Sequence, residues 1–354
     1  MWLDAVFSAL NNLKSPAFYV LDGVVVRQNP AGEAVGLSCG QKLQDRLPQL
    51  SRLPQGEEKI HMMAELSGAT WEVTASCLEE GHLILLEKVT LPEQDPLLLS
   101  AVRSIAPAVE EIIQAGGRLF PQLEELEDEE VQGHSAAISH GCFRLMRTLA
   151  ELSAYDRLCR EDAPLQKETC DVTEFFRDFA LHLGDILLEA DLKLSYTGPG
   201  KTVYGALDKQ ETKRAVLHLV SNACKFTPAG GTVSLSVKVL GKKLQILVEN
   251  PGQVDEKVLP SVFSRYAYPA STDSRQGAGL GLSLVQAIAR RHGGAALVES
   301  GRGRTAVTLT LDIQVTENML NSPRVDYTGG YDPALVELSG QLPARVFDSR
   351  SVDL

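Results

Sequence analysis

Apolar residues recur at helical spacing through two long stretches in the middle of the chain. PLLLSAVRSIAPAVEEIIQAGGRLFPQLEELEDEE places them three and four positions apart. HSAAISHGCFRLMRTLAELSAYDRL follows a break at Gln132-Gly133, and one of its faces carries Ile138, Leu145, Leu149, Leu152 and Leu158. Two long amphipathic helices cannot bury their apolar stripes alone. The pattern therefore predicts an antiparallel helical hairpin over 94–165 that pairs with a second copy into a dimeric four-helix bundle.

Before this hairpin, the apolar pattern is that of strands. AFYVLDGVVVRQN predicts a β-hairpin that turns at Asp22-Gly23, and TWEVTASCLEEGHLILLEKV predicts two more strands that turn near Gly81. A short amphipathic helix from Leu3 to Leu13 precedes them, and the residues between the two strand pairs form a polar connection. The arrangement indicates a small sensory or dimerising α/β domain over 1–93. An unspecialised α+β domain is the alternative.

After the hairpin, helical and strand patterns alternate. Helices are predicted in DVTEFFRDFALHLGDILLEA and KQETKRAVLHLVSNACKF, and strands in LKLSYT and TVYGA. A β-hairpin that turns at Gly241-Lys242 and a final strand pair in ALVESGRGRTAVTLTLDI complete the set. A mixed sheet with helices on one side predicts a two-layer α/β sandwich over 166–313, so the chain is an α+β multidomain protein. Residues 314–354 form a tail in which ALVELSG predicts one or two helical turns.

Composition and charge narrow the choice of partners and compartment. The 354 residues carry a formal net charge of -12, which disfavours binding to nucleic acid or to anionic lipid. The six cysteines form no C-x-x-C pair, so a disulfide framework or zinc site is not expected. The first residues lack the basic start of a signal peptide, and no apolar run approaches the roughly 20 residues of a transmembrane helix. We expect a cytoplasmic protein without a transmembrane segment.

One predicted helix presents three polar residues on the same face. His218, Asn222 and Lys225 stand at positions i, i+4 and i+7 of the helix in KQETKRAVLHLVSNACKF. An amide oxygen suits the coordination shell of Mg²⁺, and an ammonium suits phosphate charge. Farther along the chain, QGAGLGLSLVQAIARRHGG places Gly277, Gly279 and Gly281 directly before a helix. Glycines permit close backbone approach, and a helix N-terminus attracts anions, so the two segments predict a magnesium–phosphate site.

Four segments in this order resemble a known family. SNACKFTPAGG, SVFSRYAYP, QGAGLGLSLVQAIARRHGG and SGRGRTAVTLTL resemble the N-box, F-box, glycine box and final strand pair of sensor histidine kinases, which belong to the wider group of GHKL ATPases. The resemblance covers 170–313. It extends by position and pattern to the dimerisation and phosphotransfer helices at 94–162, and more loosely to a PAS-like domain at 1–90.

The resemblance implies an ATP-dependent protein-histidine kinase that signals to a response regulator in a two-component phosphorelay. It implies that Asn222 ligates Mg²⁺ and that Lys225 contacts phosphate. The triphosphate would lie against the glycine box, and the lid over ATP would be ordered by two aromatic residues. The residues concerned are Gly277, Gly279, Leu280 and Gly281 for the triphosphate, and Phe263 and Tyr266 for the lid.

The segment expected under the adenine departs from the family pattern. Where the family has D-x-G-x-G after a strand, this chain has ENPGQV. Glu249 or Asn250 can accept a hydrogen bond from the adenine amino group. Pro251 and Gln253 replace two flexible glycines, and the hypothesis that follows is weaker ATP binding. His218 also departs, because the family has an asparagine there; its imidazole either contributes to the site or only packs.

The most consequential departure concerns the phosphoacceptor. The family pattern H-E-x-R-T-P corresponds to AVRSIAP, which places Val102 where the histidine is expected. Valine has no nucleophilic atom, and no histidine lies between His82 and His134. His140 is a weak substitute because it falls on the second helix. An alternative function is therefore a degenerate histidine kinase that acts as an ATP-binding scaffold, phosphatase or heterodimer partner without self-phosphorylation. A more distant alternative is a protein-serine kinase of the GHKL group.

Overall fold

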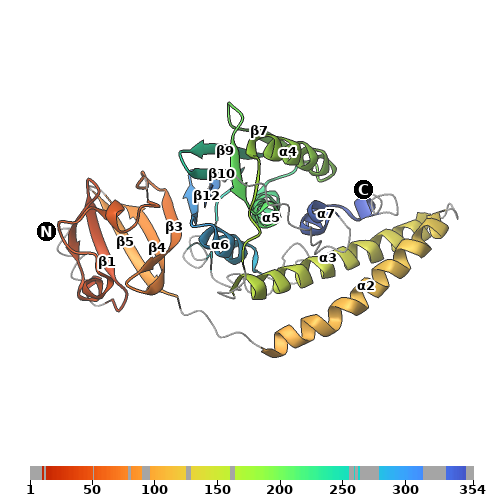
Figure 1. Ribbon diagram of the computed structural model, residues 1–354, viewed down its shortest axis with the longest axis horizontal. Helices are drawn as coiled ribbons and strands as arrows, with labels where there is room; N and C mark the ends of the chain where they lie inside the picture. Colours follow the sequence, from red (N-terminus) through yellow and green to blue (C-terminus); the bar gives the residue numbers. More distant parts are fainter. Residues whose placement is uncertain are drawn as a thin grey trace. The chain divides into compact units, whose positions relative to one another are not determined.

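The computed structural model describes residues 10–11, 13–50, 52–78, 81–89, 96–124, 129–159, 164–254, 259, 262–263, 279–313 and 332–347, of which 96–103, 120–121, 124 and 159 are described for their backbone alone. The chain forms two compact units (Figure 1). The first comprises Met1–Pro92, Gly252–Phe263 and Ala295–Leu309. The second comprises Glu93–Pro251, Ser264–Gly294 and Thr310–Leu354.

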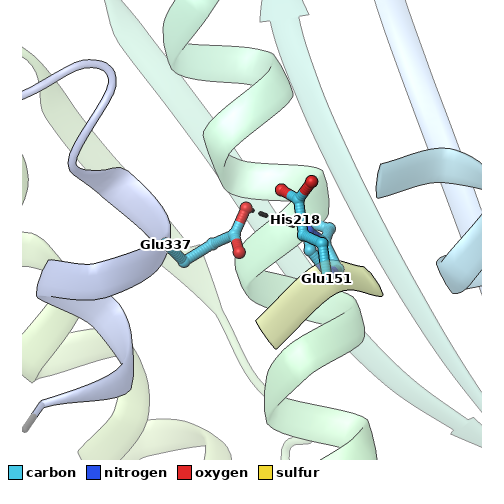
Figure 2. Close-up of side chains that lie close together, drawn as sticks. All are labelled: Glu151, His218 and Glu337. Atoms are coloured by element: carbon cyan, nitrogen blue, oxygen red, sulfur yellow. Dashed lines mark hydrogen bonds and ion pairs between the residues drawn. The ribbon is translucent and has the colours of Figure 1, made fainter. Parts of the chain in front are cut away.

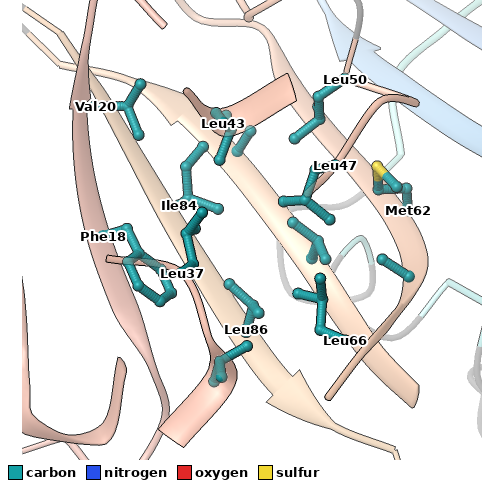
Figure 3. Close-up of a cluster of buried hydrophobic side chains, with 14 of the residues drawn as sticks. Phe18, Val20, Leu37, Leu43, Leu47, Leu50, Met62, Leu66, Ile84 and Leu86 are labelled. Atoms are coloured by element: carbon teal, nitrogen blue, oxygen red, sulfur yellow. The ribbon is translucent and has the colours of Figure 1, made fainter. Parts of the chain in front are cut away.

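The first unit is built on an antiparallel sheet in the strand order β2-β1-β5-β4-β3. Its strands are β1 (Ala17–Leu21), β2 (Val24–Gln28), β3 (Lys59–Leu66), β4 (Ala69–Cys77) and β5 (His82–Lys88). Two short 3-10 helices, η1 (Pro30–Val35) and η2 (Leu43–Asp45), connect β2 to β3. The apolar core lies between these connections and one face of the sheet, as Figure 3 shows, and includes Phe18, Leu37, Leu47, Met62 and Leu86.

Both strand pairs predicted for this region are confirmed. Asp22 and Gly23 have φ values of 49° and 77°, the left-handed backbone that a two-residue hairpin turn requires. Strand β3 was not predicted, because its residues lie in the stretch taken as a polar connection. The predicted helix from Leu3 to Leu13 falls almost entirely outside the described residues.

The same sheet continues into a segment far along the chain. Strand β11 (Ala295–Gly301) pairs antiparallel with β3, with Leu297 opposite Met62 and Glu299 opposite Ile60. Strand β12 (Arg304–Asp312) follows β11 in the sheet order. An ion pair of Arg52 joins the segments, since its guanidinium lies 2.5 Å from Glu299 of β11 and also 3.1 Å from Glu58, directly before β3. The predicted final strand pair is therefore present.

The second unit contains the helical hairpin. Helix α2 (Pro96–Glu124) packs on α3 (Glu129–Cys159) through a cluster made of Val109, Ile113, Cys142, Met146 and Leu149. The predicted break at Gln132-Gly133 is wrong, because α3 begins at Glu129 and runs through both residues. Glycine costs a helix interior only about 1 kcal/mol relative to alanine, which a long packed helix tolerates.

The remainder of this unit is the predicted mixed sheet with helices. Strand β7 (Lys193–Thr197) pairs parallel with β9 (Thr232–Leu240), and β9 pairs antiparallel with β10 (Lys243–Pro251). Helices α4 (Val172–Glu189) and α5 (Lys209–Phe226) pack on these strands, and α6 (Gly281–Arg291) packs on α5. A strand pair, β6 (Glu168–Asp171) and β8 (Tyr204–Leu207), lies beside them, and its first strand was not predicted.

The tail contributes a short helix to the second unit. Helix α7 (Pro333–Leu338) begins after Asp332, whose side chain accepts a hydrogen bond from the Ala334 backbone N–H. A 3-10 turn, η4 (Ala344–Phe347), follows, and both elements pack against α3. One or two helical turns were predicted here, and they are present. In the part of the chain that the structure describes, no helix combines the length and the apolar character that crossing a bilayer requires.

Candidate functional site

Helix α5 carries three of the predicted site residues. It begins after Asp208, whose side chain accepts a hydrogen bond from the Glu211 N–H, and it ends before Pro228, which disfavours further helix. His218 lies on its buried side with 2% of its surface exposed, whereas Asn222 and Lys225 are half-buried. The helix therefore holds the amide and the ammonium near the surface above a buried imidazole.

The structure brings the glycine segment to this helix. A Cβ atom on Gly281 would lie 3.6 Å from His218 Nδ1 and 3.8 Å from Asn222 Nδ2, so the backbone of Gly281 approaches both side chains closely. Gly279 has a φ of 71°, which favours glycine. Helix α6 begins at Gly281, and no side chain caps its first turn. Uncapped N–H groups at a helix N-terminus bind anions, so the local arrangement suits phosphate.

Two residues were predicted as alternatives for the adenine side, and they point in opposite directions. Glu249 and Asn250 are consecutive in β10, and successive side chains of a strand face opposite sides of the sheet. Asn250 shares its face with the buried Leu244, Ile246 and Val248, and is itself buried with 7% exposure. Its amide Nδ2 donates to the Pro251 carbonyl at 2.7 Å. Helix α5 also packs on this strand.

The other predicted residues have separate locations. Leu280 is buried directly before α6, and the Lys225 ammonium lies 5.3 Å from the centre of the Phe226 ring. Phe263 is buried in the first unit. Gly277 and Tyr266 lie outside the described residues, so the structure includes only some of the residues predicted to hold the triphosphate and to order the lid.

A buried cluster of charged groups surrounds His218. Its Nδ1 lies 2.8 Å from the carboxylate of Glu337 in α7, and Glu151 of α3 lies beside it (Figure 2). Arg147 joins the cluster, with its guanidinium 2.9 Å from Glu151 and 3.0 Å from Glu337. Glu151, His218 and Glu337 are each at least nine-tenths buried. The sequence did not predict this cluster.

Electrostatics differ between the two carboxyl groups. Burial raises the pKa of Glu151, and the attraction of Arg147 does not offset that effect. Burial also acts to raise the pKa of Glu337, but Arg147 and His218 outweigh it and the pKa is lowered. Glu337 is therefore the ionised partner of Arg147. An ionised acceptor also favours the His218 tautomer that carries its proton on Nδ1.

The same cluster has the ligand types of a metal site. Atoms of Glu151, His218 and Glu337 lie within 4.8 Å of one another. The guanidinium of Arg147 already bonds both carboxylates and supplies the positive charge that a cation would bring. The cluster is best described as a buried ion-pair network that holds three helices together.

The candidates for the phosphoacceptor are on the two hairpin helices. Val102 lies in the backbone of α2. His140 is on α3, where its Nε2 lies 2.5 Å from the Ser339 carbonyl and its ring stacks on Phe347 at 5.1 Å. A carbonyl accepts a hydrogen bond, so Nε2 carries the proton and its lone pair is not available to attack a phosphorus atom. The tail therefore occupies the nitrogen that the substitute acceptor would use.

The chain is similar to known proteins in this region. Residues 207–315 match the family described as histidine kinase-, DNA gyrase B-, and HSP90-like ATPase. The chain is 36% identical over 128 residues to the histidine protein kinase DivJ of Caulobacter vibrioides, covering 35% of this chain and 21% of DivJ. It is 31% identical over 150 residues to the sensor histidine kinase CusS of Escherichia coli K12, covering 42% and 29%. Each match thus spans less than a third of the relative.

Among solved structures, full-length ShkA in complex with AMPPNP aligns with a TM-score of 0.47 at 19% identity, covering 60% of this chain and 46% of that one.

Proposed function

This chain carries a histidine kinase-like ATPase domain and is related to sensor histidine kinases of two-component systems, and from that premise we propose that it binds Mg-ATP and signals to a response regulator. Asn222 would supply an amide oxygen to Mg²⁺, and Lys225 would meet phosphate charge. The N–H groups that begin α6 would hold the phosphate chain. Bound Mg²⁺ would neutralise phosphate charge, and Asn250 would accept a hydrogen bond from the adenine amino group.

One observation supports the nucleotide site above the others. His218 and Asn222 of α5 lie within 3.6 and 3.8 Å of the Cβ position of Gly281. Two helices more than fifty residues apart in sequence thus bring an amide, an imidazole and an uncapped helix N-terminus together. A metal–triphosphate needs an oxygen ligand for the metal ion beside N–H groups that bind the phosphates. The side chain of Asn222 makes no hydrogen bond to another described residue, so its amide is available to a ligand.

The test is calorimetric titration of the full chain with Mg-ATP. Asn222→Ala should weaken binding by at least about a hundredfold, because it removes a metal ligand whose loss a neighbouring water replaces poorly. Gln210→Ala is the matched control, since it truncates an amide near the other end of the same helix. Equal Mg-ATP affinity in the Asn222 variant and the wild-type chain would sink the site assignment.

We further propose a homodimer formed through the hairpin. Helix α2 exposes Ile105, Ile112 and Leu119 at intervals of seven residues, and each is about half exposed. Leu145 and Ile138 of α3 are exposed to a similar degree and also stand seven residues apart. Heptad spacing of exposed apolar side chains is typical of helices that pack on a partner helix. A second copy of the hairpin, packed as a four-helix bundle, would cover both stripes.

The remaining parts of the proposal concern context. The N-terminal sheet would serve as a PAS-like sensory domain, and the response regulator would receive the phosphoryl group. A cytoplasmic location is supported by the five described cysteines, all of which are free thiols.

A second function is favoured by one specific observation, the valine at the expected acceptor position. If Val102 is the true counterpart of the acceptor histidine, the chain binds ATP without phosphorylating itself and acts as a scaffold, phosphatase or heterodimer partner. Incubation with γ-labelled Mg-ATP separates the two functions. Acid-labile label on the protein supports the kinase, whereas Mg-ATP binding without label supports the degenerate member.

A further inference from the structure

The C-terminal segment 332–347 lies between the helical hairpin and the helices of the ATPase domain. Its helix α7 packs against α3, α5 and α4, and its turn η4 packs against α3. Six apolar side chains of the segment are buried by these contacts: Ala334, Leu335, Val336, Leu338, Leu342 and Phe347. A segment that only trailed across the surface would not bury its side chains on three different helices, so this one is an integral part of the packing.

The segment is attached to the middle of α3 by polar and aromatic contacts. Glu337 lies 3.0 Å from the Arg147 guanidinium, and the Ser339 carbonyl lies 2.5 Å from His140 Nε2. Phe347 is fully buried, with its ring centre 4.8 Å from that of Phe143 and 5.1 Å from that of His140.

The opposite side of the same segment is attached to the ATPase-domain helices. Glu337 accepts the hydrogen bond of His218 Nδ1 at 2.8 Å, and Gln341 accepts one from the Ser221 hydroxyl at 3.2 Å. Asp332 lies 2.6 Å from His182 of α4. A single carboxylate, that of Glu337, thus bonds the hairpin and the nucleotide-site helix at once, and Figure 2 shows it directed at His218 from α7.

Helix α3 also contacts the ATPase domain without the tail, because it packs on α6 and, at its C-terminal end, Arg157 forms an ion pair with the buried Glu211 of α5. That contact lies just before the connection from α3 to β6. The tail adds a further attachment about two to five helical turns from Arg157, along residues 140–151, and a separated attachment restricts rotation of the ATPase domain about the first.

We infer that segment 332–347 is an intramolecular clamp that fixes α3 to α5 and holds the ATPase domain in one position along the hairpin. Phosphoryl transfer needs the acceptor atom in line with the γ-phosphate, so a nucleotide on a fixed domain reaches only the side chains that this position allows. His140 cannot react through Nε2 in this position, because that nitrogen donates its hydrogen to the Ser339 carbonyl. Release of the clamp would break the hydrogen bond to Ser339 and let the His140 proton move to Nδ1, so that Nε2 could attack the γ-phosphorus. A P–N bond would then form as the bond to the ADP oxygen breaks, ADP would leave, and the Nδ1 proton would pass to water. This restraint on phosphoryl transfer rests on the proposed nucleotide site, whereas the clamp itself does not.

The test uses the full chain and two substitutions that act on different contacts. Glu337→Gln removes the charge shared by Arg147 and His218, and Phe347→Ala removes the packing on α3. Amide hydrogen exchange should become at least about tenfold faster over 332–347 and also over 140–151 in both variants, since the two segments open together. Arg345→Ala is the control, because that side chain is 72% exposed and bonds only at the edge of α4. It should leave both segments unchanged.

Faster exchange of the tail alone, with 140–151 protected as in the wild-type chain, would overturn the clamp. For the restraint, label transfer from γ-labelled Mg-ATP should rise at least about fivefold in the two variants, the lower end of usual coupling between sites. Unchanged or absent labelling in variants that still bind Mg-ATP by calorimetry would overturn the restraint. A wild-type chain that does not bind Mg-ATP would instead count against the proposed nucleotide site.

Discussion

Ile112→Glu is expected to dissociate the proposed dimer. The residue is in the centre of the exposed stripe on α2, where Ile112 is 52% exposed and its neighbours one heptad away, Ile105 and Leu119, are 49% and 51% exposed. Nothing else in the described part of the second unit covers these side chains. If a second copy covers them, a carboxylate placed at Ile112 would be buried among apolar groups of the partner.

The size of the effect follows from burial and symmetry. Full burial of an isoleucine is worth about 1.5–3 kcal/mol, so the half that is exposed contributes about 1 kcal/mol. A two-fold dimer contains each substitution twice, which makes the loss about 2 kcal/mol. Holding two carboxylates at an apolar contact costs at least about 2 kcal/mol more. About 4 kcal/mol corresponds to a nearly thousandfold weaker dimer.

Sedimentation equilibrium over about three decades of concentration measures this shift directly. Gln114→Glu is the matched control, because it introduces the same charge at an exposed position on the opposite side of α2, and it should dimerise like the wild-type chain. Circular dichroism should show equal helix content in all three proteins. A wild-type chain that sediments as a monomer, or an Ile112→Glu chain that dimerises normally, would refute the assignment of the stripe.

Two further predictions concern stability. Burial and, to a smaller degree, the charge of Lys59 lower the pKa of His61 from 6.5 to about 4. Between these pH values the unfolded chain binds a proton at His61 that the folded protein does not bind. The first unit should keep its stability above pH 6.5 and lose roughly 3 kcal/mol as the pH falls from 6.5 to about 4, and His61→Gln should remove most of that slope. Both tryptophans lie within 1–93, so their fluorescence reports unfolding of this region. In the second unit, Gly294→Ala would place a Cβ 1.7 Å from the Thr310 carbonyl oxygen and should cost about 3 kcal/mol or more, whereas Gly184→Ala, in α4 with open space around it, should stabilise by up to about 1 kcal/mol. Urea unfolding of the two variants side by side checks the pair, and equal midpoints would contradict the reasoning.

Elements whose ends are marked by capping, proline or turn residues could be predicted from sequence. Helix α5 is bounded by a capping aspartate and a proline, and its observed range, Lys209–Phe226, is the predicted one. The turn at Asp22-Gly23 has the residues that a two-residue hairpin demands. Strand β3 was missed because KIHMMAEL is buried on both faces over most of its length, which removes the alternation that identifies a half-exposed strand.

The candidate site was predictable in part, because some of its residues also belong to local sequence motifs. Asn222 and Gly281 belong to short motifs, and the structure places them side by side. The motif leaves the choice between Glu249 and Asn250 open, and the sequence signal that favours Asn250 is the buried alternation of Leu244, Ile246 and Val248, which continues to it.

The environment of His218 had no such signal. Its partner Glu337 is 119 residues away in a helix of six residues, too short to show a period. On α3, Arg147 and Glu151 stand four residues apart with opposite charges, the usual pattern of a solvated helix face. The tail and α5 together make that face an interior one, because the tail supplies the second carboxylate and buried apolar side chains, and His218 of α5 lies beside Glu151. The burial of this charged pair therefore could not be predicted from α3 alone, and removing the tail would leave both Arg147 and His218 without the carboxylate of Glu337.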